Sequence, residues 1–162
     1  MKNKVITMRT PRQAAKLLEF VKTLPRETTL VEVGSYAGAS AVIFAKTLKA
    51  VVCVDPWLDA DNIYELFLER TRPHKHVTHR RKTSLDAAAE FGDATLDAVY
   101  IDAAHDYEPV KADILAWRPK LKSGGVLAGH DYGKHAPGVI KAVNELIKGP
   151  IRLYGETTWH CC

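Results

Sequence analysis

Four side chains that can carry protons or bind cations follow two apolar runs in this sequence. Asp102 and His105 come after LDAVYI, and His130 and Asp131 come after VLAG. The carboxyl ends of neighbouring parallel strands open onto one crevice, so strands at these runs would bring the four together. Carboxylates and an imidazole there can bind a divalent metal, with a histidine left as general base. A helix start, a core histidine or a turn cap would explain each residue alone, but not all four in one place.

A glycine-containing turn, VEVGSYAGAS, follows an earlier apolar run and predicts a nucleotide site. Gly34 permits a sharp exit from a strand, and Gly38 permits a close backbone approach where helix N–H groups face an anionic group. Asp55 ends the next apolar run, about 20 residues beyond the turn, where an acid that binds ribose hydroxyls is expected. A bare turn and a helix-capping aspartate would explain these features separately. The spacing is not the dinucleotide pattern GxGxxG, so the turn alone does not identify the nucleotide.

Short apolar runs alternate with amphipathic stretches along the chain, which is typical of an α/β fold with a mainly parallel sheet. The last segment, IRLYGETTWHC, instead predicts two short strands around a turn at Gly155 and Glu156, so the sheet should end with an antiparallel strand. We therefore predict a single domain, residues 1–162, with an N-terminal helix region at 1–28 and a terminal hairpin at 150–162. The other predicted strands are 29–33, 50–54, 76–80, 96–101 and 126–128, and the predicted helices are 11–24, 39–48, 61–70, 84–91, 108–117 and 137–148.

The chain carries no apolar run of the ~18 residues that a membrane span needs, and its start, MKNKVITMRTPRQ, lacks a signal-peptide core. Cys53 lies inside the apolar run VVCVD and is predicted to be a small core residue. Cys161 and Cys162 are adjacent, a poor arrangement for a disulfide framework, although a metal or redox pair is an alternative to a strand-borne or frayed pair. We expect a cytoplasmic protein with no membrane partner.

The net charge is a mild +4, but cations gather in the basic tract ERTRPHKHVTHRRK, residues 69–82. Such a tract can contact phosphates or an acidic substrate. We favour a solvated helix end, loop and strand edge. A metal site at His74, His76 and His79 is disfavoured because no cysteine or carboxylate stands beside them at ligand spacing.

The motifs resemble those of the class I S-adenosylmethionine (SAM)-dependent methyltransferases, and the resemblance covers nearly the whole chain. VEVGSYAGAS looks like their first motif, which cradles the methionine part of SAM, and VVCVDPW looks like the second, with Asp55 on the ribose diol. The resemblance implies a Rossmann-like, doubly wound, mostly parallel seven-stranded sheet that ends in an antiparallel hairpin strand. The cofactor-binding residues expected from the turn, the strand ends and the resemblance are Glu32, Gly34, Ser35, Tyr36, Gly38, Ser40, Asp55, Trp57, Thr83, Ser84 and Asp102.

Recognition of the adenine is the least defined part of this expectation. The acid often found after the third strand of the family is replaced by Lys82, Thr83 and Ser84. Trp57 is expected to cover the adenine face, with a core or surface tryptophan as the alternative.

More narrowly, LDAVYIDAAHDYEPVKADILAWRPKLKSGGVLAGHDY is similar to the small O-methyltransferases grouped with macrocin-type enzymes and to the catechol O-methyltransferases. The similarity implies that Asp102, His130 and Asp131 bind Mg²⁺ and that His105 is the base. His130 departs from the pattern, because an acid is usual there. Imidazole suits Mn²⁺, Fe²⁺ or Zn²⁺ better than Mg²⁺, so the metal is expected to be changed, weak or absent.

Together these features predict a SAM-dependent O-methyltransferase that acts on a hydroxyl of a small molecule or sugar, with a catechol-like phenol as the second choice of acceptor. The expected catalytic residues are His105 and Asp102. The expected cofactor is SAM, and a divalent metal that assists it, if one is bound, is expected to be Mg²⁺ or Mn²⁺. The chain is short for such a family, so a homodimer is expected to complete the substrate site.

Two other functions compete with this prediction. A non-catalytic SAM-binding or RNA-binding protein could use the basic tract on a polyanion, and its binding would depend steeply on salt. An NAD-dependent oxidoreductase is disfavoured, because Tyr36 stands where GxG has its second glycine and because the chain ends in an antiparallel hairpin.

Overall fold

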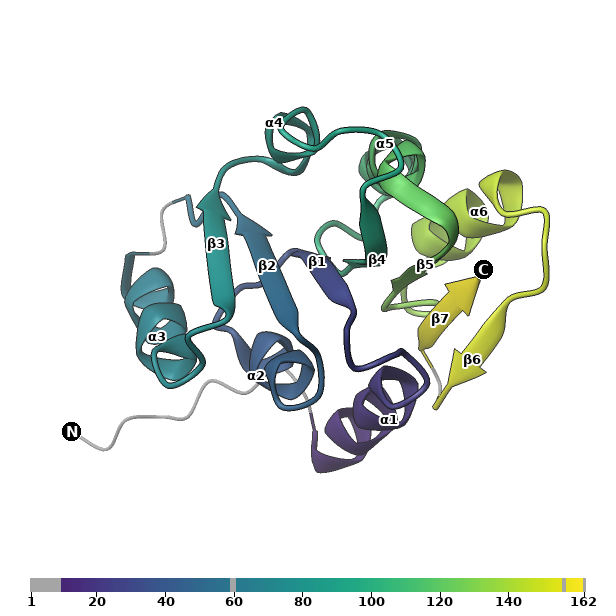
Figure 1. The fold of residues 1–162 in the computed structure, drawn as a ribbon. Coiled ribbons are helices and arrows are strands. Elements are labelled where there is room, and N and C mark those ends of the chain that lie inside the picture. The colour runs from purple at the N-terminus through teal and green to yellow at the C-terminus, as the bar shows by residue number, and fades with distance from the viewer. Residues whose placement is uncertain (1–9, 59–60, 156, 162) are drawn as a thin grey trace.

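The structure, a computed structural model, describes residues 10–58, 61–155 and 157–161. Its sheet has the strand order β3-β2-β1-β4-β5-β7-β6, and all pairs are parallel except β5–β7 and β6–β7 (Figure 1). The seven strands are β1 (Thr29–Val33), β2 (Ala50–Asp55), β3 (Val77–Arg81), β4 (Leu96–Ile101), β5 (Leu121–Gly129), β6 (Arg152–Tyr154) and β7 (Thr158–Cys161). The predicted fold class, a doubly wound and mostly parallel sheet with antiparallel strands at its C-terminal edge, is confirmed.

Helices cover both faces of this sheet. On one face lie α1, α2 and α3, and on the other lie α4, α5 and α6 (Figure 1). The helices are α1 (Pro11–Val21), α2 (Ala39–Ala45), α3 (Asp61–Thr71), α4 (Ser84–Ala88), α5 (Tyr107–Trp117), the 3₁₀ turn η1 (Arg118–Lys120) and α6 (Pro137–Leu146).

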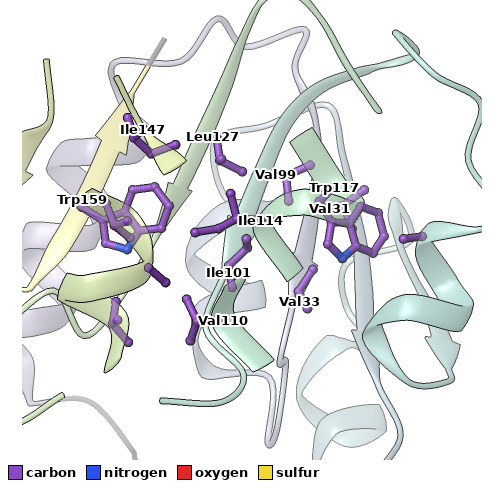
Figure 2. Close-up of a cluster of buried hydrophobic side chains, with 14 of the residues drawn as sticks. Val31, Val33, Val99, Ile101, Val110, Ile114, Trp117, Leu127, Ile147 and Trp159 are labelled. Atoms are coloured by element: carbon purple, nitrogen blue, oxygen red, sulfur yellow. The ribbon is translucent and has the colours of Figure 1, made fainter. Parts of the chain in front are cut away.

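The central strands are apolar because they are buried on both faces. Leu30 of β1 packs with the helices α1 and α2, whereas its neighbour Val31 packs with α5, since successive side chains of a strand point to opposite faces. Figure 2 shows the hydrophobic core on the face covered by α4, α5 and α6, where Ile114 and Trp117 of α5 lie against the strands. Two tightly packed layers therefore fix the positions of the strand ends.

Four predicted helices end earlier than their apolar periodicity indicated. Leu24 and Leu48 are buried, yet both lie in turns beyond the last residues of α1 and α2. Periodicity records which side chains are buried and does not show where the backbone hydrogen bonds of a helix stop. The start of α1 was well marked, because Thr10 and Gln13 form a reciprocal capping box.

The predicted strand 126–128 is longer at both ends, as β5 covers nine residues from Leu121 to Gly129. We expected a turn at Gly124 and Gly125, but the strand continues through this pair with an irregularity in its register with β4. A bulge in a strand accommodates glycine well, and Gly124 has a φ of +76°.

Cys53 and Cys161 are buried free thiols, so the prediction of a core cysteine at position 53 is confirmed. Burial beside Glu32 raises the pKa of Cys53 well above its ordinary value. Cys162 and the turn residue Glu156 lie outside the described residues. None of the helices in the described ranges combines the length and apolarity that a membrane crossing requires.

Candidate functional site

A cavity of about 430 Å³ opens at the carboxyl ends of β1, β2, β4 and β5. It lies where β1 pairs with both β2 and β4, which is the point at which the strand order reverses. Its volume falls in the range of roughly 300–1,000 Å³ that is typical of small-molecule sites. The predicted residues that line it are Gly34, Ser35, Tyr36, Ser40, Asp55, Ser84, Asp102, His105, His130 and Asp131.

Gly34 lets the ends of β1 and β4 approach each other. It has a φ of +89°, and a Cβ at this position would stand 2.2 Å from the carbonyl oxygen of Asp102. Its N–H donates to the carbonyl oxygen of Val54, which ties β1 to β2 at the same level. Only glycine fits this turn, so the cavity floor is backbone rather than side chain.

Asp55 holds together the two loops that follow β1 and β2. Its carboxylate accepts hydrogen bonds from the backbone N–H groups of Tyr36 at 2.9 Å and of Trp57 at 2.8 Å. The indole N–H of Trp57 in turn donates to the carbonyl oxygen of Tyr36 at 2.7 Å. A carboxylate has about four acceptor positions, so Asp55 keeps capacity to accept further hydrogen bonds from a diol in the cavity.

Four predicted cofactor residues do not line the cavity: Glu32, Gly38, Trp57 and Thr83. Trp57 is 2% exposed and packs against Tyr64 and Phe67 of α3, so its placement does not support the expected stacking on adenine.

Glu32, Gly38 and Thr83 do not line the cavity, but they contact or adjoin residues that support it. Glu32 is fully buried and accepts a hydrogen bond from the Ser35 hydroxyl at 2.7 Å. Gly38 is the left-handed N-cap of α2, and a Cβ there would meet the ring of Phe67 at 3.0 Å. Thr83 caps α4 and leaves its neighbour Ser84 to face the cavity.

Asp131 lies at the centre of a group of three histidines. Its Oδ1 is 3.0 Å from Nδ1 of His130 and 2.9 Å from Nε2 of His135, and its Oδ2 is 2.8 Å from Nε2 of His105. His105 and His135 are more than half exposed, whereas the Asp131 side chain is 14% exposed. Burial alone would raise the pKa of Asp131, but hydrogen bonds with His130 and His135, and the charges that His130 and His105 carry when protonated, hold it well below its usual value.

Asp102, His130 and Asp131 offer ligand atoms that lie within 4.8 Å of one another, as a shared cation would require. Nδ1 of His130 is 3.7 Å from Oδ1 of Asp102. Two carboxylates and one imidazole suit Mn²⁺ better than Mg²⁺. The donor set therefore fits a divalent transition metal.

The terminal hairpin fixes the orientation of His130. The hydroxyl of Thr157 is 2.9 Å from Nε2 of His130, and the indole N–H of Trp159 donates to the carbonyl oxygen of His130 at 3.2 Å. These contacts leave Nδ1 directed at the two carboxylates. The hairpin at the antiparallel edge of the sheet thus holds one of the candidate metal ligands, His130, in place.

Sequence reasoning did not assign four polar side chains to this site. His135 and Thr157 touch the predicted residues directly, while Gln13 of α1 and Arg70 of α3 line the cavity. The capping pattern at Gln13 indicated a helix start and nothing about a cavity. For His135 a signal existed, since it stands four residues after Asp131.

The basic tract is partly engaged within the chain. Arg80 and Lys82 pair with Glu90, and Arg70 donates to the carbonyl oxygen of Ala37 at 3.0 Å. Arg81 lies over the ring of Tyr64 at 4.7 Å from its centroid. Four cations of the tract therefore have partners within the fold, and one of them, Arg70, also lines the cavity.

A sequence model of the methyltransferase-domain family matches residues 31–132, and the chain belongs to this family. The matched region runs from β1 through the residues that follow β5, so it includes the glycine turn, Asp55, Asp102 and Asp131. The fold is that of the class I SAM-dependent methyltransferases, which confirms the resemblance of the motifs.

Two similar solved structures have the same fold. An O-methyltransferase from Bacillus cereus in complex with S-adenosylhomocysteine (SAH) is 17% identical, with a TM-score of 0.71 over 94% of this chain and 80% of that chain. CalS11, a TDP-rhamnose 3′-O-methyltransferase of calicheamicin biosynthesis, is 20% identical, with a TM-score of 0.64 over 91% of this chain and 75% of that chain.

Two curated relatives are uncharacterized proteins. One, y4gI from Sinorhizobium fredii, is 28% identical over 120 residues, which is 65% of this chain. The other, R132 from Acanthamoeba polyphaga mimivirus, is 26% identical over 132 residues, or 75% of this chain. The chain spans 13% of the length of the first relative and 60% of the second.

Proposed function

We propose that the protein transfers the methyl group of SAM to a hydroxyl oxygen of a small molecule or sugar, with His105 as general base. The observation that carries the proposal is that His105 lines the same cavity as Gly34 and Asp55. The resemblance to O-methyltransferases and the two solved structures support an oxygen acceptor. A sugar hydroxyl is the first choice of acceptor and a catechol-like phenol the second.

Each of these residues has a defined task. Gly34 leaves room for the cofactor on the cavity floor, and Asp55 accepts hydrogen bonds from the ribose diol. SAM, when bound, supplies a methyl group on a sulfonium, whose carbon–sulfur bond breaks with its electron pair left on sulfur. His105 accepts the proton of the acceptor hydroxyl as the oxygen takes the methyl group. The base raises the nucleophilicity of the oxygen, and the cavity aligns it.

A divalent metal is a second part of the proposal. Asp102, His130 and Asp131 would hold it, and Mn²⁺ fits this donor set. When bound, such an ion supplies electrostatic stabilisation of a developing oxyanion. We also propose that a homodimer completes the acceptor site, which sedimentation of a monomer at working concentration would contradict.

The first experiment identifies the nucleotide. SAH and NAD⁺ are titrated separately into the protein in EDTA, and then with Mg²⁺ or Mn²⁺, while heat and melting temperature are followed. Selective stabilisation by SAH is expected from mass action. Binding of NAD⁺ alone, or of neither nucleotide, would overturn the proposal, and salt-sensitive binding of RNA would favour a polyanion-binding protein.

The second experiment tests the base. Labelled SAM is incubated with a panel of glycans and phenols, and His105→Ala is compared with wild type and with His74→Ala, a histidine that does not line the cavity. Loss of a general base lowers kcat by roughly 10²- to 10⁴-fold. His105→Ala is therefore expected to lose turnover and to keep SAH affinity, whereas full activity of this variant would show that the base is another group.

A further inference from the structure

The contacts of Asp131 restrict which ring nitrogens of its histidines carry protons. An ionised carboxylate can only accept hydrogen bonds, and a neutral imidazole has one N–H and one bare nitrogen. The nitrogens that face Asp131 are Nε2 of His105, Nε2 of His135 and Nδ1 of His130. With no metal bound, each of these nitrogens therefore bears hydrogen, and three of roughly four acceptor positions of the carboxylate are filled.

The same accounting leaves the other nitrogens as acceptors. Nε2 of His130 accepts from the hydroxyl of Thr157, which closes the network on that side. Nδ1 of His105 remains as a basic nitrogen on a ring that lines the cavity and is 58% exposed. An imidazole whose N–H is held by a buried carboxylate is fixed in one tautomer and one ring orientation, and the carboxylate stabilises the imidazolium formed after proton transfer.

We propose that Asp131 is the orienting carboxylate of His105 and that His135 is a positioning residue, which acts by holding the Asp131 carboxylate. This inference rests on the proposed function and deepens it, because it assigns the proton of the acceptor hydroxyl to Nδ1 of His105.

His135 can hold the carboxylate in a way that a hydrophobic residue cannot. Its Nε2–H binds Oδ1 at 2.9 Å, while His105 binds the other oxygen at 2.8 Å, so the two imidazoles fix the rotation of the carboxylate about its Cβ–Cγ bond. The backbone at Asp131 is left-handed, with a φ of +59°, and the N–H of Gly133 donates to its carbonyl oxygen at 2.8 Å. Turn and imidazoles together direct Oδ2 at His105.

The test follows the tautomer of His105 by long-range ¹H–¹⁵N NMR of the SAH-bound protein in EDTA, with His105→Gln used to assign its signals. Wild type is expected to show the Nε2–H tautomer at His105. Asp131→Asn replaces an acceptor oxygen by an NH₂ donor at nearly the same volume, so the His105 ring is expected to shift toward the Nδ1–H tautomer. His74→Ala, which removes an imidazole that does not line the cavity, should leave the His105 signals in place.

Kinetics with the best acceptor found in the panel provide the second readout. Asp131→Asn is expected to lower kcat at least a hundredfold, as loss of the orienting carboxylate does in other His–Asp pairs. His135→Ala should lower kcat roughly three- to tenfold without changing KM or the Kd of SAH. His135→Gln, which restores an N–H donor, should recover most of that loss.

Some results would overturn the inference. An Nδ1–H tautomer of His105 in wild type, or an unchanged tautomer in Asp131→Asn, contradicts the role of Asp131, and equal kcat values of wild type and His135→Ala contradict the role of His135. The NMR readout needs no turnover. A protein with the expected tautomer but no methyl transfer to any acceptor would therefore count against the proposed function and leave the orientation of His105 by Asp131 standing.

Discussion

Gly34 and Asp102 lie so close at the ends of β1 and β4 that a Cβ on residue 34 would stand 2.2 Å from the Asp102 carbonyl oxygen. The neighbouring Cα of Ala103 would be 2.6 Å from the same Cβ. Both obstacles are backbone, which cannot rotate away as a flexible side chain can. The glycine of the turn is therefore a requirement of the strand ends, in addition to any contact with a cofactor.

Gly34→Ala is expected to destabilise the fold even without a ligand. Strain at a left-handed position costs about 1–3 kcal/mol, and the backbone clash adds to it. A loss of roughly 3 kcal/mol corresponds to a fall in Tm of roughly 6–12 °C for a domain of this size. Thermal unfolding of wild type and Gly34→Ala without ligand measures this difference in Tm.

Gly124→Ala is the matched control for this prediction. Gly124 has a φ of +76°, but a Cβ there would meet nothing within 4 Å. The Gly124→Ala variant is expected to lose stability only through backbone strain, on the order of 1 kcal/mol in the free energy of unfolding. Equal losses in the two variants would show that the close approach to Asp102 contributes nothing.

The positions of β1, β2 and β4 could be predicted from sequence because burial on both faces makes each of these central strands a mostly apolar run. The runs that end in Asp55 and Asp102 also revealed which side chains stand at the carboxyl edge. Helix ends were less predictable, since Leu24 and Leu48 continue the apolar pattern beyond the helices. For Trp57, the sequence placed the residue next to the site but could not tell which way the side chain of a left-handed residue points.

Asp55→Asn is expected to weaken SAH binding. The variant loses the negative charge and one acceptor oxygen, so it cannot serve the N–H groups of Tyr36 and Trp57 and a ribose diol together. Hydrogen bonds to a charged group contribute about 1.5–3 kcal/mol, which corresponds to a rise in Kd of roughly ten- to a hundredfold. Isothermal titration with SAH measures the change.

Asp97→Asn is the control for Asp55→Asn. Asp97 also accepts a hydrogen bond from a backbone N–H, that of Thr29 at 2.9 Å, but it lies at the opposite end of the sheet. It is expected to lower stability and to leave the Kd of SAH within about twofold of wild type. If both variants bind SAH as wild type does, Asp55 only ties the two loops together.

Thr157→Val tests whether the hairpin supports a metal site. A hydroxyl can donate or accept, so Thr157 can serve His130 in either tautomer, including the one whose Nδ1 is free to bind an ion. Loss of such a supporting contact typically lowers metal affinity about 10- to 100-fold. Titration with Mn²⁺, followed by electron paramagnetic resonance, measures the affinity.

Thr95→Val, which removes a hydroxyl bound to the carbonyl oxygen of Gly92 before β4, is expected to leave Mn²⁺ binding unchanged. An affinity that is the same in Thr157→Val and wild type would mean that the hairpin does not orient a metal ligand. Failure of wild type to bind Mn²⁺ would instead remove the metal from the proposed function.

The convergence of the acids and histidines was predictable, whereas their partners were not. Asp102 and Asp131 follow neighbouring strands, so topology alone brings them together. The contacts of Asp131 with His105 and His135 depend on a left-handed turn at a non-glycine residue, which a sequence does not announce. Thr157 reaches His130 only because β7 adds to β5 in antiparallel register.

The buried imidazole of His160 is expected to make the stability of the fold depend on pH. It lies on β7 and packs edge-on against the rings of Phe20 and Tyr154, and neither of its ring nitrogens has a hydrogen-bond partner among the residues that the structure describes. Burial, and to a lesser degree the charge of Arg152, lowers its pKa below the ordinary 6.5. Between the lowered pKa and 6.5 the unfolded chain binds more protons than the folded one, so stability from the neutral imidazole is complete above pH 6.5 and falls as the pH drops below it.

His160→Leu removes the titrating group and keeps an apolar side chain in its place. Between pH 7.5 and pH 5.5, wild type is therefore expected to lose more stability than His160→Leu, as measured by urea denaturation at several pH values. His79, whose pKa is lowered by burial and by Arg80, has the same sign and is present in both proteins, so its contribution cancels in the comparison. His74→Leu, at a loop position, should follow wild type. Parallel curves for wild type and His160→Leu would show that the folded state accommodates a charged His160 as well as water does.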